Sequence, residues 1–419
     1  MLKRLLTIAL LGACLALPLA AQSDDKAIWD ACEKSADAQS VAAKIAACTD
    51  LIQNDRYDDA DRAAALTNRG IGHAFEQNHD AAIRDYTAAI RLRPNDSSAY
   101  FNRGIEYSAK GEQDRAILDF DKTIQINPAD AASFYGRGVA YSKKAAHARA
   151  IQDFNEAIRL DPNYVNAYYG RAISHSDNDQ HDLAIKDYDE VLRRNPADAE
   201  AFYGRGLAYT NIGQHDRAIQ DLDRAIELKP AYPEAFNERG FAYASKGDYE
   251  RAIKDYDESI RLEPSYAGTY ADRGRALIQL GRFDAAAADF AVGASKDKTD
   301  PYAPLWRYIT EVRLGRADAL ANLRSATSEI DRSVLGWASI ALFLGEATPE
   351  QSLARINDQD PKLRREQECE ILFYLAHYHL ARGEKDRAID YFKRVVATGV
   401  TDFIEFEGAA FELKRLGAQ

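Results

Sequence analysis

Apolar positions are distributed along this chain with the spacing of paired helices. The stretch AFYGRGLAYTNIG covers residues 201–213. Its Phe202, Gly206 and Tyr209 fall at i, i+4 and i+7, which places them on one face of a helix. A second amphipathic segment follows and stops at Pro230, because proline cannot continue a helix. Such a pair cannot bury its apolar faces alone, so the pattern predicts that neighbouring pairs stack.

The pattern returns at a constant interval between residues 63 and 300, which gives seven consecutive repeats. An arginine holds the same place in each repeat: Arg69, Arg103, Arg137, Arg171, Arg205, Arg239 and Arg273. A small alanine recurs on the second helix: Ala82, Ala116, Ala150, Ala184, Ala218, Ala252 and Ala286. A proline closes six repeats: Pro94, Pro128, Pro162, Pro196, Pro230 and Pro264. This internal recurrence predicts a helical array.

The period of about 34 residues, the small residues at fixed places and the closing proline resemble the tetratricopeptide repeat (TPR). The resemblance implies an all-α TPR solenoid, a right-handed superhelix of helix–turn–helix repeats with helical caps. Repeats 1 to 7 span residues 63–300. Residues 22–62 are predicted to form an N-terminal helical cap, and residues 301–368 irregular helical pairs. Residues 369–419 are predicted to form one further TPR unit and a C-terminal cap helix.

An aspartate accompanies the arginine on the second helix of every repeat: Asp85, Asp119, Asp153, Asp187, Asp221, Asp255 and Asp289. Seven of each predict a ladder of ion pairs between neighbouring helices, with Arg137 and Arg205 among its members. TPR units more usually carry an apolar residue at the arginine position, so the ladder is a departure from that family's pattern. Catalysis needs one special site, and recurrence in every repeat therefore favours a structural role.

The first residues have the composition of an export signal. Lys3 and Arg4 precede an apolar run, and small residues stand at Ala20 and Ala21, so residues 1–21 are predicted to be removed on export. Cys14 follows Leu-Gly-Ala, as in a bacterial lipobox, which gives the alternative of a lipid anchor at that cysteine. The protein is therefore expected to be exported and periplasmic, and membrane-attached only if Cys14 is lipidated.

Two cysteines of the predicted N-terminal cap are expected to pair. Cys32 and Cys48 would face each other if residues 22–62 pack as a helical pair. Export makes a disulfide chemically reasonable, because disulfides persist in oxidising compartments. The sequence therefore predicts a Cys32–Cys48 disulfide.

Charge and motif content exclude several functional classes. The 419 residues include 54 basic and 66 acidic residues, a formal net charge of −12, which disfavours a nucleic-acid surface. No HExxH, paired CxxC or GxSxG motif is present, and the histidines are scattered. We therefore expect no catalytic residues, no metal and no cofactor. An enzyme that acts on cell-wall material, with a site within 301–368, remains an alternative.

A stripe on the first helices of repeats 2 to 5 is predicted to bind a partner. By resemblance to TPR proteins, positions 5 and 9 of each repeat line the concave groove. Here they are Phe101 and Ile105, Tyr135 and Val139, Tyr169 and Ile173, and Tyr203 and Leu207. Aromatic anchors suit protein recognition. The alternative is that these rings pack against the adjacent helix. The neighbouring Phe134, Tyr168 and Phe202 are expected to hold the core, so the scaffold is expected to survive loss of the three tyrosines.

The C-terminal third carries a second resemblance. The segment FYLAHYHLARGEKDRAIDYFKRVVATGVTDFIE, preceded by a Trp-containing helical pair and a pair ending in FLG, resembles the NlpI-type periplasmic TPR lipoproteins. Proteins of that type are envelope scaffolds that bring peptidoglycan hydrolases to a processing protease. The resemblance implies an exported, non-enzymatic adaptor that binds envelope proteins or peptide segments in its groove. A homo-oligomerisation module, in which the groove holds a neighbour's terminal helix, is the alternative from the same surface.

Overall fold

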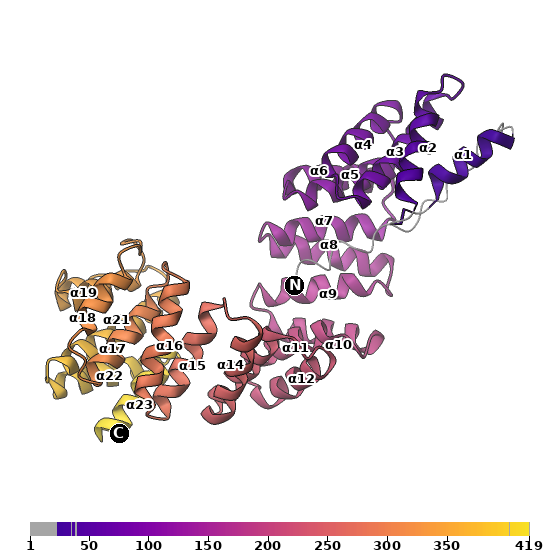
Figure 1. Ribbon diagram of the computed structural model, residues 1–419. Helices are drawn as coiled ribbons and strands as arrows, with labels where there is room; N and C mark the ends of the chain where they lie inside the picture. Colours follow the sequence, from indigo (N-terminus) through magenta and orange to yellow (C-terminus); the bar gives the residue numbers. More distant parts are fainter. Residues whose placement is uncertain (1–22, 35, 38–39, 402, 419) are drawn as a thin grey trace. The chain divides into compact units, whose positions relative to one another are not determined.

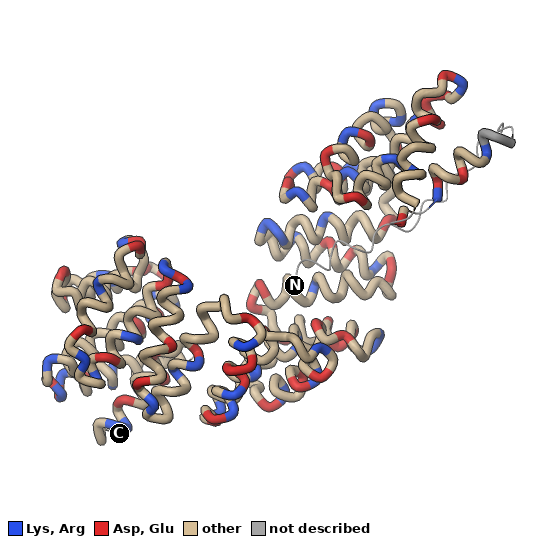
Figure 2. Tube along the Cα trace, in the orientation of Figure 1, with Lys and Arg blue, Asp and Glu red and all other residues tan. Residues whose placement is uncertain are grey.

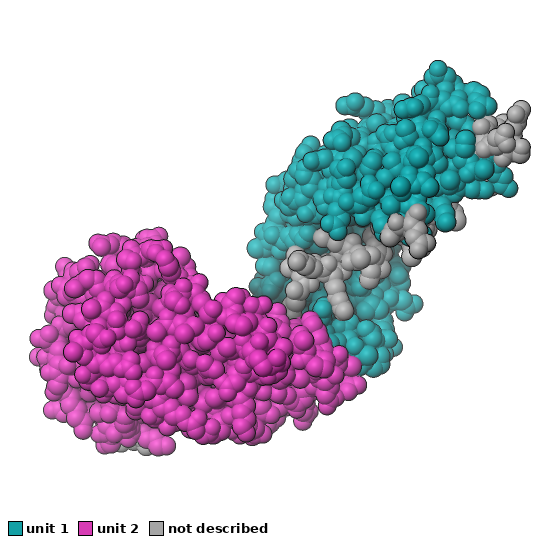
Figure 3. Space-filling view, viewed as in Figure 1, with its two compact units in different colours: residues 1–214 teal, residues 215–419 magenta. Residues whose placement is uncertain are grey.

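The computed structural model describes residues 23–34, 36–37, 40–401 and 403–418, which form 23 α-helices and no β-strand (Figure 1). The chain divides into two compact units, residues 1–214 and 215–419, hereafter the N-terminal and C-terminal units (Figure 3). The predicted signal peptide and Cys14 lie outside the described residues. The helix content and the pairing of consecutive helices confirm the predicted all-α TPR solenoid.

The N-terminal unit contains the predicted cap, repeats 1 to 4 and the first helix of repeat 5. Its helices are α1 Ser23–Glu33, α2 Val41–Gln53, α3 Asp59–Phe75, α4 His79–Leu92, α5 Ser97–Ala109, α6 Gln113–Ile126, α7 Ala131–Lys143, α8 His147–Leu160, α9 Val165–Ser176, α10 His181–Arg194 and α11 Ala199–Asn211. Acidic and basic positions are interspersed along these helices (Figure 2).

The C-terminal unit begins with the last repeat helices and continues into less regular pairs. Its repeat helices are α12 His215–Leu228, α13 Pro233–Ser245, α14 Tyr249–Leu262, α15 Ala267–Gln279 and α16 Phe283–Lys296. They are followed by α17 Tyr302–Arg313, α18 Ala319–Ala326, α19 Gly336–Leu344, α20 Pro349–Leu353, α21 Pro361–Ala381, α22 Lys385–Ala397 and α23 Ile404–Leu416. Helix α21 begins at Pro361, where Asp360 caps it, ahead of residue 369, at which the further TPR unit is predicted to start.

The helix boundaries reproduce the sequence period because the same turn chemistry recurs. The second helices α4, α6, α8, α10, α12, α14 and α16 all start at the same position of their repeats, from His79 in the first to Phe283 in the last. The turn before each of them needs a left-handed residue, which is glycine in most repeats, for example Gly111 at φ +80°. In three repeats Gln77, Ala145 and Asp179 adopt this conformation at φ between +56° and +58°.

Close helix contact within a repeat depends on a glycine of the first helix. A Cβ atom at Gly240 would lie 2.8 Å from the ring of Tyr256, and one at Gly104 would lie 3.0 Å from the ring of Phe120. Tyr256 and Phe120 are 1% exposed, so these rings have no room to withdraw. Glycine therefore lets the second-helix aromatic reach the first-helix backbone.

The recurrent arginines form the predicted ladder, through bidentate ion pairs. In six repeats the arginine donates from Nε and Nη2 to the two carboxylate oxygens of the aspartate 16 residues later, at 2.6–2.9 Å. The pairs are Arg69–Asp85, Arg103–Asp119, Arg137–Asp153, Arg171–Asp187, Arg239–Asp255 and Arg273–Asp289. The aspartates are 4–7% exposed, so each pair is largely removed from solvent.

The same guanidinium groups also reach the preceding repeat. Nη1 of Arg137 donates to Asp121 at 2.6 Å, and Nη1 of Arg205 donates to Asp189 at 2.5 Å. Equivalent donations run to Thr49, Thr87, Asn155, Asp223 and Asp257. Arg103, Arg137, Arg171, Arg239 and Arg273 therefore bond the second helices of two consecutive repeats, and Arg69 bonds the first repeat to the cap helix α2. We call this arrangement the arginine clamp.

A single aromatic cluster organises the C-terminal unit beyond the repeats. The Trp306 ring lies 5.3 Å from Phe373 and 6.1 Å from Phe290, between centroids. Phe392 of α22 packs on Phe373 at 6.0 Å. These contacts join the last repeat to α17, α21 and α22, so the irregular pairs continue the core of the array.

The predicted disulfide is present in the N-terminal cap. The sulfur atoms of Cys32 and Cys48 are 2.07 Å apart, and their Cα atoms are 4.9 Å apart. Both cysteines are 0% exposed and pack with Trp29 and Leu51. The bond joins α1 to α2 within the apolar cluster of the cap.

Replacing Arg137 tests the clamp. Burial raises the pKa of Asp153 above its ordinary value even with Arg137 beside it, so an aspartate without its arginine is unfavourable. We expect Arg137→Ala to lower the free energy of unfolding by about 2 kcal/mol or more. The matched control Arg159→Ala breaks an exposed pair with Glu156 and should change it by about 0.5 kcal/mol or less. Equal effects in urea unfolding would contradict the clamp.

Loss of the disulfide should loosen the cap. Replacing Cys32 and Cys48 with serine opens a loop of 16 residues' separation, so we expect the cap to lose about 3 kcal/mol of stability. Hydrogen exchange of α1 and α2 measures this loss. Reductant should lower the stability of the unmodified protein and leave that of the double variant unchanged. A reductant effect on the double variant would show that another thiol is responsible.

Candidate functional site

The predicted groove stripe of repeats 2 to 5 is only partly accessible. Phe101, Ile105, Tyr169, Ile173 and Leu207 are half-buried. Tyr135, Val139 and Tyr203 are buried, at 6%, 6% and 9% exposure. The expectation that the stripe tyrosines are separable from the core is wrong for Tyr135 and Tyr203.

The stripe aromatics pack on the second helix of their own repeat. Ring centroids are 5.8 Å apart in each of the pairs Phe101–Phe120, Tyr135–Phe154 and Tyr169–Tyr188. The ring of Tyr164, which precedes α9, also packs on Tyr135, with 5.0 Å between ring centroids. The alternative that these rings pack against an adjacent helix therefore holds for three repeats. A partner-binding role for the remaining exposed edges stays a prediction.

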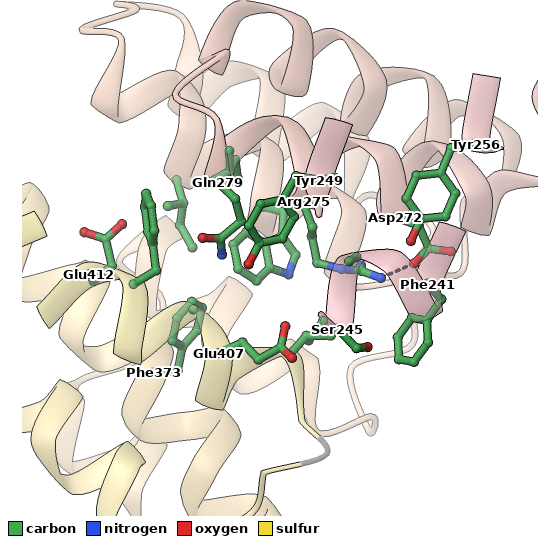
Figure 4. A pocket seen from close by; sticks show the side chains of 18 of the residues that line it. Phe241, Ser245, Tyr249, Tyr256, Asp272, Arg275, Gln279, Phe373, Glu407 and Glu412 are labelled. Carbon is green, nitrogen blue, oxygen red and sulfur yellow. Dashed lines mark hydrogen bonds and ion pairs between the residues drawn. The ribbon is translucent and has the colours of Figure 1, made fainter. Parts of the chain in front are cut away.

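A deeper concave site lies within the C-terminal unit, between repeats 6 and 7 and the C-terminal helix α23 (Figure 4). This cleft encloses about 720 Å³, its open mouth included. The repeats contribute Phe241, Ser245, Tyr249, Asp272, Arg275 and Gln279. The opposite wall comes from Trp306, Ile309, Phe373, Ile404, Glu407, Phe411 and neighbouring residues of α17, α21 and α23. We call this site the α23 cleft.

A half-buried acidic network lies at the repeat side of the α23 cleft. Asp272 is ion-paired with Arg275 and accepts a hydrogen bond from Asn237 Nδ2 at 3.1 Å (Figure 4). Burial raises the pKa of Asp272. Burial and the neighbouring Asp272 raise the pKa of Glu238 to about 7. The cleft therefore combines an apolar wall with fixed hydrogen-bonding groups, the combination that ligand sites use for affinity and orientation.

One end of the cleft is closed by buried polar groups of α17, α21 and α23. Glu412 is 3% exposed and is held by Arg313 and by Arg415, the latter at 2.8 Å. Burial lowers the pKa of His377 to about 3, so its imidazole is neutral at physiological pH. This ring packs on Phe373 and Phe392 at 4.7 and 5.1 Å, so His377 acts as a core residue.

A shallower groove continues the α23 cleft along the outer side of α23. It is lined by Ala244, Tyr249, Gln279, Phe406, Ala410, Phe411 and Lys414, among others. Phe406 and Phe411 are half-buried, and Lys414 is exposed. The two hollows share Tyr249, Gln279, Glu407 and Phe411, so they form one elongated surface of mixed polarity.

The α23 cleft was not among the sequence-predicted sites, although one signal for it exists. Position 5 changes from aromatic residues in repeats 2 to 5 to Asn237 and Ala271 in repeats 6 and 7. Position 9 changes from aliphatic residues to Phe241 and Arg275. This change marks the two repeats whose first helices face α23. The partner helix itself lies too far along the chain for any local pattern to place it.

Within the part of the chain that the structure describes, no group of three or more His, Cys, Asp or Glu residues is arranged to hold a metal ion. None of its helices has both the length and the apolar character that crossing a bilayer requires.

The repeat geometry and the family comparison agree on the class of protein. Paired helices that stack at a constant period define a helical-repeat solenoid. Tetratricopeptide repeat families match residues 86–117, 131–164, 169–233 and 233–266. The chain is a tetratricopeptide-repeat protein. Such repeats are generally non-catalytic scaffolds for protein interaction.

Solved structures of other TPR proteins are similar to parts of this chain. YrrB, a TPR protein with an unusual peptide-binding site, is 27% identical over 43% of this chain and 92% of its own, with a TM-score of 0.39. MamA from Desulfovibrio magneticus RS-1 is 25% identical over 40% and 96%, with a TM-score of 0.39. A TPR protein from Parabacteroides merdae ATCC 43184 is 18% identical over 59% and 98%, with a TM-score of 0.49.

Two substitutions at Tyr135 separate packing from hydrogen bonding. Its hydroxyl is buried and has no hydrogen-bond partner among the described residues. We therefore expect Tyr135→Phe to leave the free energy of unfolding unchanged or to raise it by about 1 kcal/mol. Tyr135→Ala should lower it by about 3 kcal/mol or more. Leu118→Ala, at a side chain 67% exposed, should change it by less than about 0.5 kcal/mol. Tolerance of Tyr135→Ala in thermal and urea unfolding would contradict the packing role.

Proposed function

We propose that the protein is an exported TPR adaptor that binds a segment of an envelope protein in the α23 cleft. In this role it would present bound cell-wall hydrolases to a processing protease. The elongated surface of mixed polarity carries the proposal. It offers the aromatic edges of Phe241 and Phe411 together with the polar groups of Gln279 and Glu407. Aromatic anchors flanked by fixed polar groups are typical of protein-binding surfaces.

The accessibility of Phe241 supports this choice over the stripe of repeats 2 to 5. Phe241 is 39% exposed and lines the cleft, whereas Tyr135 and Tyr203 are buried. A partner can contact an exposed ring without any rearrangement of the core. The C-terminal unit also contains the residues that resemble the NlpI-type lipoproteins, which favours a partner site there.

The Cys32–Cys48 disulfide supports the proposal of export. Structural disulfides persist in oxidising compartments and are rare where thiols are kept reduced. The disulfide agrees with the export signal expected at residues 1–21. We therefore propose the periplasm as the working compartment.

Site-specific crosslinking tests the proposed function. A photoreactive phenylalanine at position 241 should form an adduct with a foreign envelope protein in envelope extracts. The same probe at Leu320, which is 40% exposed on α18, should not form it. We expect Phe241→Ala to weaken binding of a peptide from the adduct by about thirtyfold, while Leu320→Ala leaves the affinity unchanged. Calorimetry and a thermal melt measure affinity and folding.

Three outcomes distinguish the alternatives. Adducts with a second copy of this chain alone would favour the homo-oligomerisation module. Equal adducts at positions 241 and 320 would show that crosslinking is non-specific and would contradict the cleft. Unchanged affinity in a folded Phe241→Ala variant would contradict binding in the α23 cleft and would favour the stripe of repeats 2 to 5 as the binding surface.

A further inference from the structure

A second, smaller hollow of the C-terminal unit lies where α17, α21 and α23 meet. It is lined by Tyr302, Glu370, Phe403, Ile404 and Glu405. Glu370 and Glu405 are each 4% exposed, although carboxylates are rarely buried without a positive partner. We call this hollow the acidic cavity.

The hydrogen bonds of the acidic cavity leave one carboxylate oxygen unused. Tyr302 donates its hydroxyl to Glu370 Oε2 at 3.1 Å, and Tyr374 donates to Glu405 Oε1 at 3.4 Å. Glu370 Oε1 is sealed from solvent and has no hydrogen-bond partner among the described residues. A buried oxygen of this kind is destabilising when nothing donates to it. The cavity is therefore incomplete as an acceptor site.

The charges around the acidic cavity do not balance. Asp300 adds a third acidic group, whose oxygens cap the start of α17 through the backbone amides of Tyr302 and Ala303. The basic group that acts on Glu405 is Arg275, which is already ion-paired with Asp272. Burial and the neighbouring Glu405 raise the pKa of Glu370 to about 8, and burial raises that of Glu405. Near neutral pH, Glu370 is therefore neutralised by a bound proton and not by a cationic partner.

We propose that the acidic cavity binds a primary ammonium group, with Glu370 and Glu405 as acceptors and the rings of Tyr302 and Phe403 against its alkyl stem. An ammonium supplies three donors and one positive charge, which match two carboxylates and an unused oxygen. Aromatic rings add a favourable contact with a cation. Among the described residues no third metal-ligating side chain joins the two carboxylates, and hard divalent cations need more oxygen ligands than these.

The ammonium can come from a lysine side chain or from a free amino terminus. Ile404 lines both the acidic cavity and the α23 cleft, so a lysine of a segment held in the cleft can reach the carboxylates. Binding of a partner's lysine in the acidic cavity rests on the proposed function. Binding of a free amine is independent of the proposed function, because it requires only the cavity.

Calorimetric titration of the full chain with Nα-acetyl-lysine amide tests the inference. We expect binding that tightens roughly tenfold or more between pH 6.5 and pH 8.5, because the amine must displace the proton on Glu370. About one proton should be released per amine at pH 6.5, measured in buffers of different ionisation heat. The Nε-acetylated analogue is neutral and should not bind. Alanine amide, which offers an amino terminus, shows which source of ammonium fits.

Matched variants identify the carboxylates. Glu370→Gln keeps the shape of the side chain and should abolish amine binding, whereas Glu346→Gln, at an exposed position, should bind as the unmodified protein does. Phe241→Ala should retain amine binding even where it loses a cleft-bound peptide, so the two proposals fail separately. Undiminished binding by Glu370→Gln, or binding of Ca²⁺ with no binding of any amine, would overturn the inference.

A thermal melt provides a second measurement on the same variants. Since Glu370 holds its proton in the folded state and releases it on unfolding, stability should fall as the pH rises from about 4.5 to about 8. Glu370→Gln should flatten this dependence and confirm that the variant is folded. The amine should raise the melting temperature above pH 8 in the unmodified protein only. An amine-induced rise in Glu370→Gln of the same size would overturn the inference.

Discussion

The arginine clamp is the interaction on which the repeat array depends. Burial of apolar surface explains why helical pairs stack. This effect is non-directional, so it does not by itself fix how one pair is aligned along the next. A guanidinium has a fixed planar geometry, and here it meets a carboxylate in its own repeat and an oxygen of the preceding one. Its contacts lie 16 residues away in each direction, so one side chain specifies both the intra-repeat and the inter-repeat alignment.

Much of the fold was predictable because its determinants are local and recur. Pro128 and Gly111 mark helix ends through backbone conformations that recur in other repeats. The arginines and aspartates recur in equal number, one of each per repeat, which indicated that they pair. The disulfide followed from the same logic, since two cysteines on a predicted helical pair face each other. Helix α21 starts at Pro361, ahead of the predicted TPR unit, and the repeat pattern begins only after its first two turns.

The candidate sites were less predictable because they depend on contacts between distant segments. Tyr135 lies on the expected helix face, but the ring of Tyr164 packs on it. The spacing of apolar residues does not predict such a contact between a helix and a preceding or following loop. The α23 cleft joins residues of repeats 6 and 7 to a helix more than a hundred residues further along. Glu370 and Glu405 belong to different helices, and each is an ordinary glutamate in its own sequence context.

The clamp also constrains how such a chain can change in length over evolutionary time. Because arginines such as Arg137 and Arg273 bond partners 16 residues on either side, duplication or loss of one complete repeat preserves this spacing in the remaining repeats. Insertion of half a repeat between an arginine and one of these partners would instead break the 16-residue spacing of that contact. An array of this kind can therefore lengthen by whole repeats without loss of its ion pairs, whereas intermediate lengths would break them.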